Sequence, residues 1–71
     1  SVQFNGGKSH FVNKLHVVGN MYVEYAADVT FDDCTIVEDA LDFKATTGGT
    51  VMNVNKYLQV GSLVTNQEIY T

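Results

Sequence analysis

The sequence predicts an all-β fold made of short strands that stack as repeated units. Val and Thr are frequent, and four Tyr and four Phe are spread over the 71 residues, a composition typical of strands. Apolar and polar residues alternate over short stretches, which indicates half-buried strands. A stretch at residues 6–19 returns without a gap at residues 48–61. Repeats of this length in a β-rich chain are typical of stacked, solenoid-like or fibrous architectures.

The two copies of the repeat are related by a constant offset of 42 residues. Seven of the fourteen aligned positions are identical: Gly6/Gly48, Gly7/Gly49, Val12/Val54, Asn13/Asn55, Lys14/Lys56, Val18/Val60 and Gly19/Gly61. A weaker half-period of about 21 residues predicts two stacked units per repeat. No linker or boundary interrupts the pattern, so we expect residues 1–71 to form one β-repeat segment.

The size of the chain limits what it can bury alone. A domain this small removes only about 60% of its unfolded surface from water, and small folds usually add disulfides, a metal or oligomerisation. The single cysteine, Cys34, excludes an internal disulfide, and no Cys/His cluster offers a zinc site. We therefore expect self-association, membership of a longer chain, or both. The start at Ser1 and the strand-like stretch at 67–71 favour the longer chain.

In the first half of the chain, strands are expected to end at Gly, Asn or Asp. Val2 and Phe4 alternate with polar residues over 1–5, and the following Asn-Gly-Gly supplies the positive φ values of a tight turn. Residues 10–18 are predicted to be one extended strand. Further strands are expected at 21–25, 29–32 and 34–37, separated by a turn at 19–20, a corner at 26–28 and a bend at Asp33.

The stretch 29–36 resembles one unit of a β-helix, because two short strands flank a polar corner. Its alternation places Cys34 and Ile36 together on the inward side. Residues 37–45 fit either a helical stripe (Val37, Ala40, Leu41, Lys44) or a strand (Leu41, Phe43, Ala45), and the neighbouring strands favour the strand. A turn at 46–49 then precedes strands at 50–54, 57–60, 63–65 and 68–70.

Charge and hydropathy exclude two classes of partner. The net charge is −4, with four Lys and no Arg, so the basic stripe that nucleic-acid binding requires is missing. No apolar run approaches the about 20 residues that span a bilayer, and no signal-peptide pattern is present. We expect no nucleic-acid partner and no membrane insertion.

Two motifs could suggest nucleotide or metal chemistry. Gly6-Gly7-Lys8-Ser9 invites a phosphate-loop interpretation, but Val2 stands where that motif needs another Gly, and a strand-like stretch follows instead of a helix. A Gly-Gly turn between strands is the expected structure. His10 and His16 would lie roughly 20 Å apart on one strand, too far to share a metal within a chain. Symmetry copies of one His could meet on a threefold axis.

The acids gather in the middle of the chain, and seven of the eight lie between Glu24 and Asp42. Carboxylates at corners are usually solvated, although such a cluster could also bind Ca²⁺ weakly or hydrolyse glycosides. Cys34 fits a small buried hydrophobe better than a nucleophile. The four tyrosines could stack on sugars, and Asn13 and Asn55 could cap corners or form side-chain ladders. We expect no catalytic, cofactor-binding or metal-binding residue.

The motif at residues 5–20, which returns as Val-Asn-Lys-Tyr-Leu-Gln-Val-Gly-Ser-Leu at 54–63, resembles the shafts of bacteriophage tail fibres and tail spikes. The resemblance covers residues 2–25 and 48–70. It implies an elongated β-helix or β-prism formed by an intertwined homotrimer in the virion tail. The middle stretch 29–36 is more similar to the single-chain right-handed β-helix of pectate lyases and tail-spike depolymerases.

The resemblance implies a structural or adhesive role in host-cell attachment, with a cell-surface polysaccharide or an outer-membrane protein as receptor. The alternative is part of a β-helical polysaccharide lyase or hydrolase, with Asp32, Asp33 and nearby acids in a groove. A third hypothesis is a bacterial β-solenoid filament or adhesin. No catalytic residue transfers from these families, because none of their active-site motifs is matched here.

Overall fold

The structure is a computed structural model that describes residues 1–44 and 48–71. Its strands belong to two sheets, in which every pairing is parallel. The strands are β1 (Val2–Phe4), β2 (Lys8–Phe11), β3 (Leu15–Val17), β4 (Met21–Val23), β5 (Asp28–Phe31), β6 (Cys34–Phe43), β7 (Val51–Val54) and β8 (Tyr57–Thr65). None of the described residues forms a helix long and apolar enough to cross a membrane.

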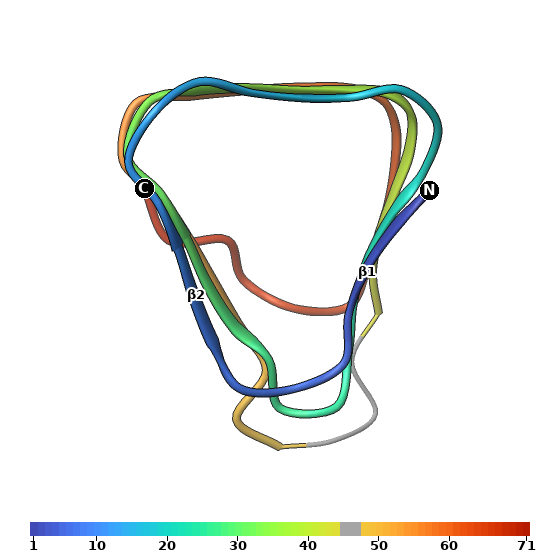
Figure 1. Ribbon diagram of the computed structural model, residues 1–71. Coiled ribbons are helices and arrows are strands. Elements are labelled where there is room, and N and C mark those ends of the chain that lie inside the picture. The colour runs from blue at the N-terminus through green and yellow to red at the C-terminus, as the bar shows by residue number, and fades with distance from the viewer. Residues whose placement is uncertain (45–47) are drawn as a thin grey trace.

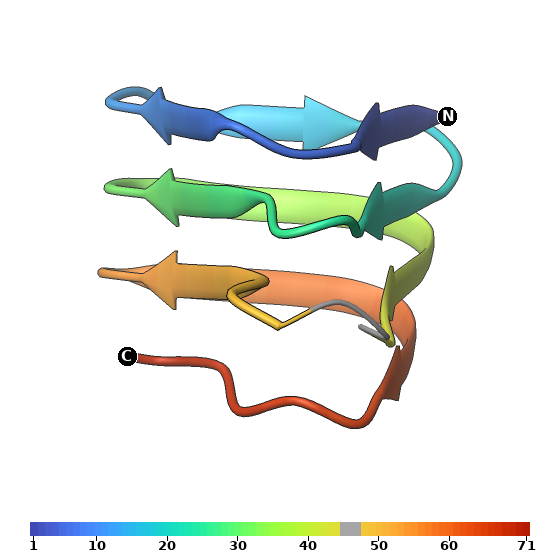
Figure 2. The ribbon, with the colours of Figure 1, turned by 90° about the horizontal axis from the view of Figure 1, so that it is seen from below.

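The chain runs around a three-sided circuit and then repeats that circuit on top of itself (Figures 1 and 2). One sheet has the order β2-β5-β7, and the other has the order β1-β4-β6-β3 with β8 also paired to β6. We call the circuits the first layer (residues 1–20), the middle layer (21–40) and the third layer (41–62, with 45–47 not described). Residues 63–71 form the final segment. Each layer therefore lies directly against the next along the chain.

Inward-facing side chains form columns that run from layer to layer. Phe11 is in register with Phe31, and Phe31 with Val54; the two rings stack with centroids 5.7 Å apart. Parallel in-register pairing places each strand residue over its partner, so one alternating pattern buries the same face in every layer. The buried core consists of Val17, Met21, Val23, Ala27, Val29, Phe31, Val37, Leu41, Phe43, Met52 and Val54.

The corner after β1 and after β4 requires left-handed backbone. Gly6 and Gly7 have φ values of 133° and 70°, which glycine adopts without strain. At the same corner of the middle layer, Tyr25 and Ala26 have φ values of 55° and 62°, where a Cβ costs roughly 1–2 kcal/mol per residue. The Ala26 N–H donates to Thr50 Oγ1 at 2.9 Å, so a contact to the next layer holds the strained corner.

The predicted all-β class is confirmed, but the elongated shape is not found. The Cα extents are 27 × 21 × 18 Å. Layers of parallel strands lie only about 4.8 Å apart, so a few of them make a compact body whose stacking direction is not its long dimension. The strand interpretation of residues 37–43 is confirmed by β6. Ala45 and the first half of the predicted turn at 46–49 lie outside the described residues.

Three other details of the prediction are wrong. The single strand at 10–18 is broken between β2 and β3 by a corner at Val12, Asn13 and Lys14, because the circuit must bend there. The two predicted strands at 57–60 and 63–65 are one continuous strand, β8. The expected last strand at 68–70 is a single bridge between Tyr70 and Asn53.

The register also differs from the sequence repeat. Phe11 and Val54 share a column, as do Leu15 and Leu58, so stacked residues of the first and third layers are 43 positions apart in these strands. The identical Val12 and Val54 consequently have different surroundings, since Val12 is 64% exposed and Val54 is 5% exposed. A one-residue difference reverses the face of every side chain in a strand.

Candidate functional site

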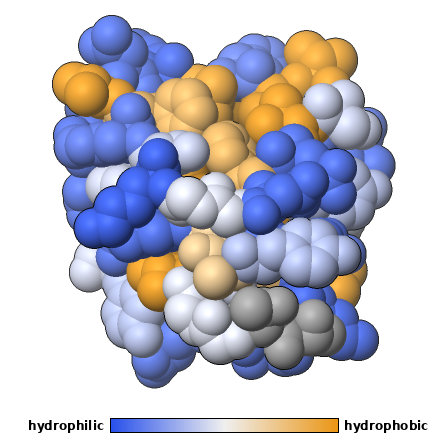
Figure 3. Space-filling view, turned by 60° about the horizontal axis from the view of Figure 1, so that its bottom comes forward, coloured by the Kyte–Doolittle hydropathy of each residue, from blue (hydrophilic) through white to orange (hydrophobic). Residues whose placement is uncertain are grey.

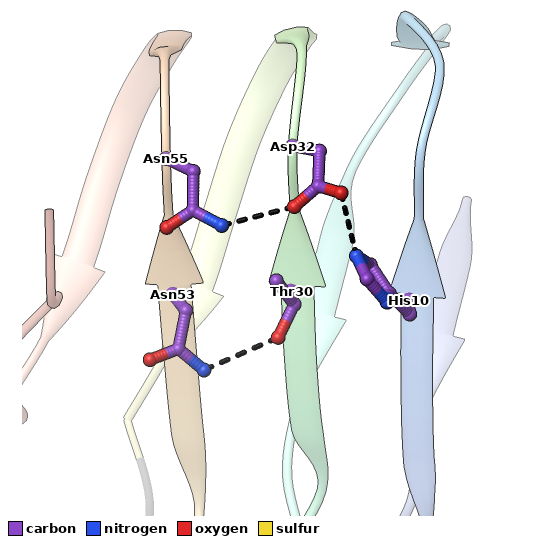
Figure 4. Close-up of polar contacts among 5 residues, drawn as sticks. All are labelled: His10, Thr30, Asp32, Asn53 and Asn55. Carbon is purple, nitrogen blue, oxygen red and sulfur yellow. Dashed lines mark hydrogen bonds and ion pairs between the residues drawn. The ribbon is translucent and has the colours of Figure 1, made fainter.

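The outward face of β2-β5-β7 carries a network of polar side chains that crosses all three layers (Figure 4). His10 Nε2 lies 2.7 Å from Asp32 Oδ2, and the Asn55 side-chain amide donates to Asp32 Oδ1 at 2.9 Å. Two residues earlier in the chain, the Asn53 amide lies 3.3 Å from Thr30 Oγ1 and 3.4 Å from Asp28 Oδ1. We call the five residues drawn in Figure 4 the polar face: His10, Thr30, Asp32, Asn53 and Asn55.

Local structure explains why these residues face water. Residues on β5 alternate between half-buried and buried, with Val29 and Phe31 fully inward, so Thr30 points outward. Asp32 directly follows β5, at the corner that leads to β6, and its backbone N–H donates to the Phe11 carbonyl oxygen at 2.9 Å. The equivalent N–H of Asn55 donates to Phe31. The backbone stacking thus sets the two side chains next to each other.

The two carboxylates at this corner, Asp32 and Asp33, are stabilised in their ionised form. Hydrogen bonds from Asn55 and His10 lower the pKa of Asp32 below its ordinary value, because both donors favour the ionised form. The pKa of Asp33 is also lowered, first by the backbone N–H of Cys34 and then by the nearby Lys56. Lys56 Nζ lies 3.5 Å from Asp33 Oδ1. Both carboxylates are therefore suited to accepting hydrogen bonds and poorly suited to donating a proton.

The histidines do not share a strand face, contrary to the expectation. His10 lies on β2 and His16 on β3, on two different sides of the circuit. Each contacts a carboxylate of the middle layer: His10 contacts Asp32, and His16 Nε2 lies 2.6 Å from Glu38 Oε2. The spacing of 22 residues that joins both pairs becomes informative only when the layer register is known.

The Gly6-Gly7-Lys8-Ser9 motif is a turn that enters a strand. Gly6 and Gly7 form the corner, and Lys8 and Ser9 begin β2. No helix N-terminus follows them, so the backbone amides that would hold a phosphate are engaged in strand pairing with β5. The interpretation as a Gly-Gly turn between strands is confirmed.

Cys34 is not on the inward side as predicted. Thr35 and Val37 are buried at 0% and 1% exposure, whereas Cys34 and Ile36 are half-buried on the outward side. The alternation restarts after the corner at Asp33, whose carboxylate accepts the Cys34 N–H at 2.7 Å. Thr35 is tolerated in the core because its hydroxyl donates to the Asp33 carbonyl oxygen at 3.5 Å.

The tyrosines come from four different elements. Tyr22 lies on β4 and accepts from the Asn20 amide at 3.4 Å, while the Tyr57 hydroxyl on β8 donates to Gln59 at 3.1 Å. Tyr25 lies at a corner, and Tyr70 lies in the final segment; both side chains are more than half exposed. At its corner, the Asn55 side-chain amide donates to the Asp32 carboxylate of the middle layer, and Asn13 is exposed.

Sequence reasoning missed Thr30 and Asn53 as members of a site. Their signal is a polar residue at the outward position of the same column in two successive layers, which requires the register to be recognised. In the part of the chain that the structure describes, no pocket is found, and no group of three His, Cys, Asp or Glu side chains could hold a metal ion.

Comparison with protein-family models, with curated proteins and with solved structures found no match for this chain.

Proposed function

We propose that this chain is a β-helical structural segment of a bacteriophage tail fibre or tail spike, which supports attachment to the host cell. The observation that carries the proposal is the in-register stacking of parallel layers with apolar columns inside and polar side chains outside. Such stacking can be extended indefinitely in one direction, which is how a rod of any length is built. The resemblance of residues 2–25 and 48–70 to tail-fibre shafts supports the same role.

The pairing pattern favours a single-chain β-helix over an intertwined one. β5 is paired to β2 on one side and to β7 on the other, and β6 lies between β3 and β8 in the same way. A strand from a second chain cannot enter between these layers without displacing a partner. In the homotrimer that we propose, three such segments therefore pack side by side in the virion tail. Its receptor is a cell-surface polysaccharide or an outer-membrane protein.

The second candidate function is a polysaccharide lyase or hydrolase, which the pairing of His10 with Asp32 favours. A glycosidase needs one carboxylic acid that stays protonated near neutral pH. The pKa values of Asp32 and Asp33 are both lowered, so neither carboxylate is suited to be that acid. The fibre role is thus better supported. A bacterial β-solenoid filament or adhesin would share the same fold and is the third candidate.

The first test of the fibre role is the mass of the complex that the chain forms in solution. We expect light scattering to give three times the 7.8 kDa chain mass, in a complex that resists SDS because packed β-rich trimers unfold slowly. A monomer at all concentrations would contradict the trimer.

The enzyme alternative has a separate measurement. The chain is incubated with capsular polysaccharides, and released reducing ends are counted. Release that disappears in an Asp32→Asn variant, but persists in an Asp39→Asn variant as the matched control, would replace the fibre role with the enzymatic one.

A further inference from the structure

The end of the molecule formed by the first layer has strand edges without a partner. Among the described residues, β1 pairs only with β4, β2 only with β5, and β3 only with β6. Each therefore presents a row of backbone N–H and C=O groups on its outer edge, which is a template for another strand. The three strands form the uppermost layer in Figure 2, at one end of the stack.

The interior at this end is only partly covered. Val2, Phe4, Phe11 and Leu15 face inward, but they are half-buried instead of buried. The rings of Phe4 and Phe11 meet edge to face with centroids 5.7 Å apart and form part of this surface. Figure 3 shows apolar surface gathered in the middle of its upper part, where the first layer lies, between hydrophilic flanks.

The rim of this end is cationic. Residues 1–23 contain Lys8, His10, Lys14 and His16 and no Asp or Glu. The two histidines already contact carboxylates of the middle layer, whereas within the described residues no ion pair is found for Lys8 or Lys14. Two lysines without an anionic partner thus flank the open strand edges.

The middle layer shows what chemistry fits against these strands. It covers their other edge, and it carries Glu24, Asp28, Asp32, Asp33, Glu38 and Asp39 with no Lys. It supplies both His contacts, and Asp28 lies in register with Lys8. The first layer can contact a neighbouring layer on each of its two sides, and on one side that neighbour is the acidic middle layer. In this interface, apolar columns lie inside and opposite charges lie outside.

The opposite end of the molecule is a poorer match for the first layer. The final segment runs across it (Figure 1): Ile69 packs against the core, and Tyr70 pairs with β7 through N–H···O bonds of 2.6 and 3.0 Å. Lys56 follows β7 at this end. Stacking a second copy head to tail would displace the final segment and bring Lys56 opposite Asn13, one residue from Lys14. Like charges disfavour that arrangement.

We propose that the first-layer end is a docking surface for another parallel β layer that carries carboxylates at its corners, an acidic protein segment like the middle layer of this chain. The incoming layer extends both sheets, covers Phe4, Phe11 and Leu15, and places carboxylates next to Lys8 and Lys14. This inference requires only the layered fold and does not depend on a role in a virion.

The test adds such a layer to the full chain. A second copy of residues 21–40 is joined directly to Val2, in place of Ser1, because residue 40 precedes the column that Val2 begins. A matched chain carries Asp28→Asn, Asp32→Asn and Asp33→Asn in the added copy only. Backbone amide exchange of β2 and β3 and the thermal midpoint are measured for the original chain and both extended chains.

The acidic extension is expected to slow exchange at β2 and β3 by about tenfold or more and to raise the thermal midpoint. The neutral extension should slow this exchange and raise the thermal midpoint by less. Added salt should reduce the difference in exchange and midpoint between the two extended chains. Unchanged exchange at β2 and β3 would overturn the docking surface, and equal effects of the two extensions would overturn the preference for acids. Concentration-dependent association of the original chain that protects both β1–β3 and β8 would show that a second copy is the occupant instead.

Discussion

The middle layer and the first layer have the same strand pattern, but their inward side chains have different surroundings. In the middle layer, Val29, Phe31 and Val37 are at most 1% exposed, whereas Phe4, Phe11 and Leu15 of the first layer remain half-buried. The difference comes from neighbours, because the middle layer is covered on both sides and the first layer on one. Val17 of the first layer is an exception at 3% exposure, but for most inward side chains burial follows the position in the stack.

The largest expected effect comes from emptying the same column in these two layers. Phe31→Ala should destabilise the chain by about 3–5 kcal/mol, because the ring is fully buried and its neighbours cannot collapse into the space. Phe11→Ala, in the same column, should cost about 2 kcal/mol, since part of its ring already contacts water. Urea unfolding followed by circular dichroism measures both. If both variants lost the same free energy of unfolding, the first and middle layers would be equally covered.

Gly61 tests how closely the third layer approaches the middle one. A Cβ at this position would lie 2.5 Å from the Glu38 carbonyl oxygen and 2.7 Å from that of Asp39, and both are backbone atoms opposite the irregular register of β6. Gly61→Ala should therefore destabilise by about 2–3 kcal/mol through overpacking. Gly48→Ala is the matched control, because no atom of the residues that the structure describes lies within 4 Å of its Cβ position. A neutral Gly61→Ala would mean that the layers can separate there.

Local patterns in the sequence predict most strands but not how they stack. Alternation of apolar and polar residues, ended by Gly, Asn or Asp, places β1, β4, β5 and β7 closely, because those signals are short-range. The register is a long-range property. The identities at an offset of 42 include Val12 and Val54, whose exposed fractions differ, while stacking follows an offset of 43 in β2, β5 and β7.

The candidate site depends on that register and could not be predicted without it. His10 and Asp32 are 22 residues apart and meet only because β2 lies beside β5. Asp33 and Asn55 were singled out as corner residues, and the structure places both at the corner that follows the β2-β5-β7 sheet. Their partners, Lys56 and Asp32, come from adjacent layers. Corner chemistry is local and predictable, whereas contacts between layers are not.

Substituting Ala26 by glycine should stabilise the chain, whereas most substitutions destabilise it. Its φ of 62° is strained, and the equivalent corner of the first layer uses glycine. Ala26→Gly should stabilise the chain by about 0.5–1 kcal/mol, the left-handed strain released less the extra entropy of the unfolded chain. Ala40→Gly in β6 is the control and should destabilise by about 0.5–1 kcal/mol. A loss of stability in Ala26→Gly, seen as a lower urea midpoint, would show that its Cβ contact outweighs the strain.

The smallest expected effect concerns the exposed contacts between layers at Asp32. Its pKa is lowered from 3.8, first by the hydrogen bond from Asn55 and then by His10. A folded-state pKa below the unfolded value means that the contribution to stability is present above pH 3.8 and is lost as pH falls through the lower folded value. The contacts of Asp32 between the layers should thus persist below pH 3.8 and be lost only at the lower pH where the folded-state carboxylate is protonated.

Carboxyl NMR titration measures this shift residue by residue. Asn55→Ala should raise the pKa of Asp32 toward its ordinary value, and by more than His10→Ala does, because the Asn55 bond is the larger cause. Asn53→Ala is the matched control: its amide lies near Asp28 and Thr30 instead, so the Asp32 pKa should stay lowered. If Asn53→Ala moved that pKa as much as Asn55→Ala, the polar face would act through general loosening of β7. In that case the third layer, like the first, would be held more weakly than the middle one.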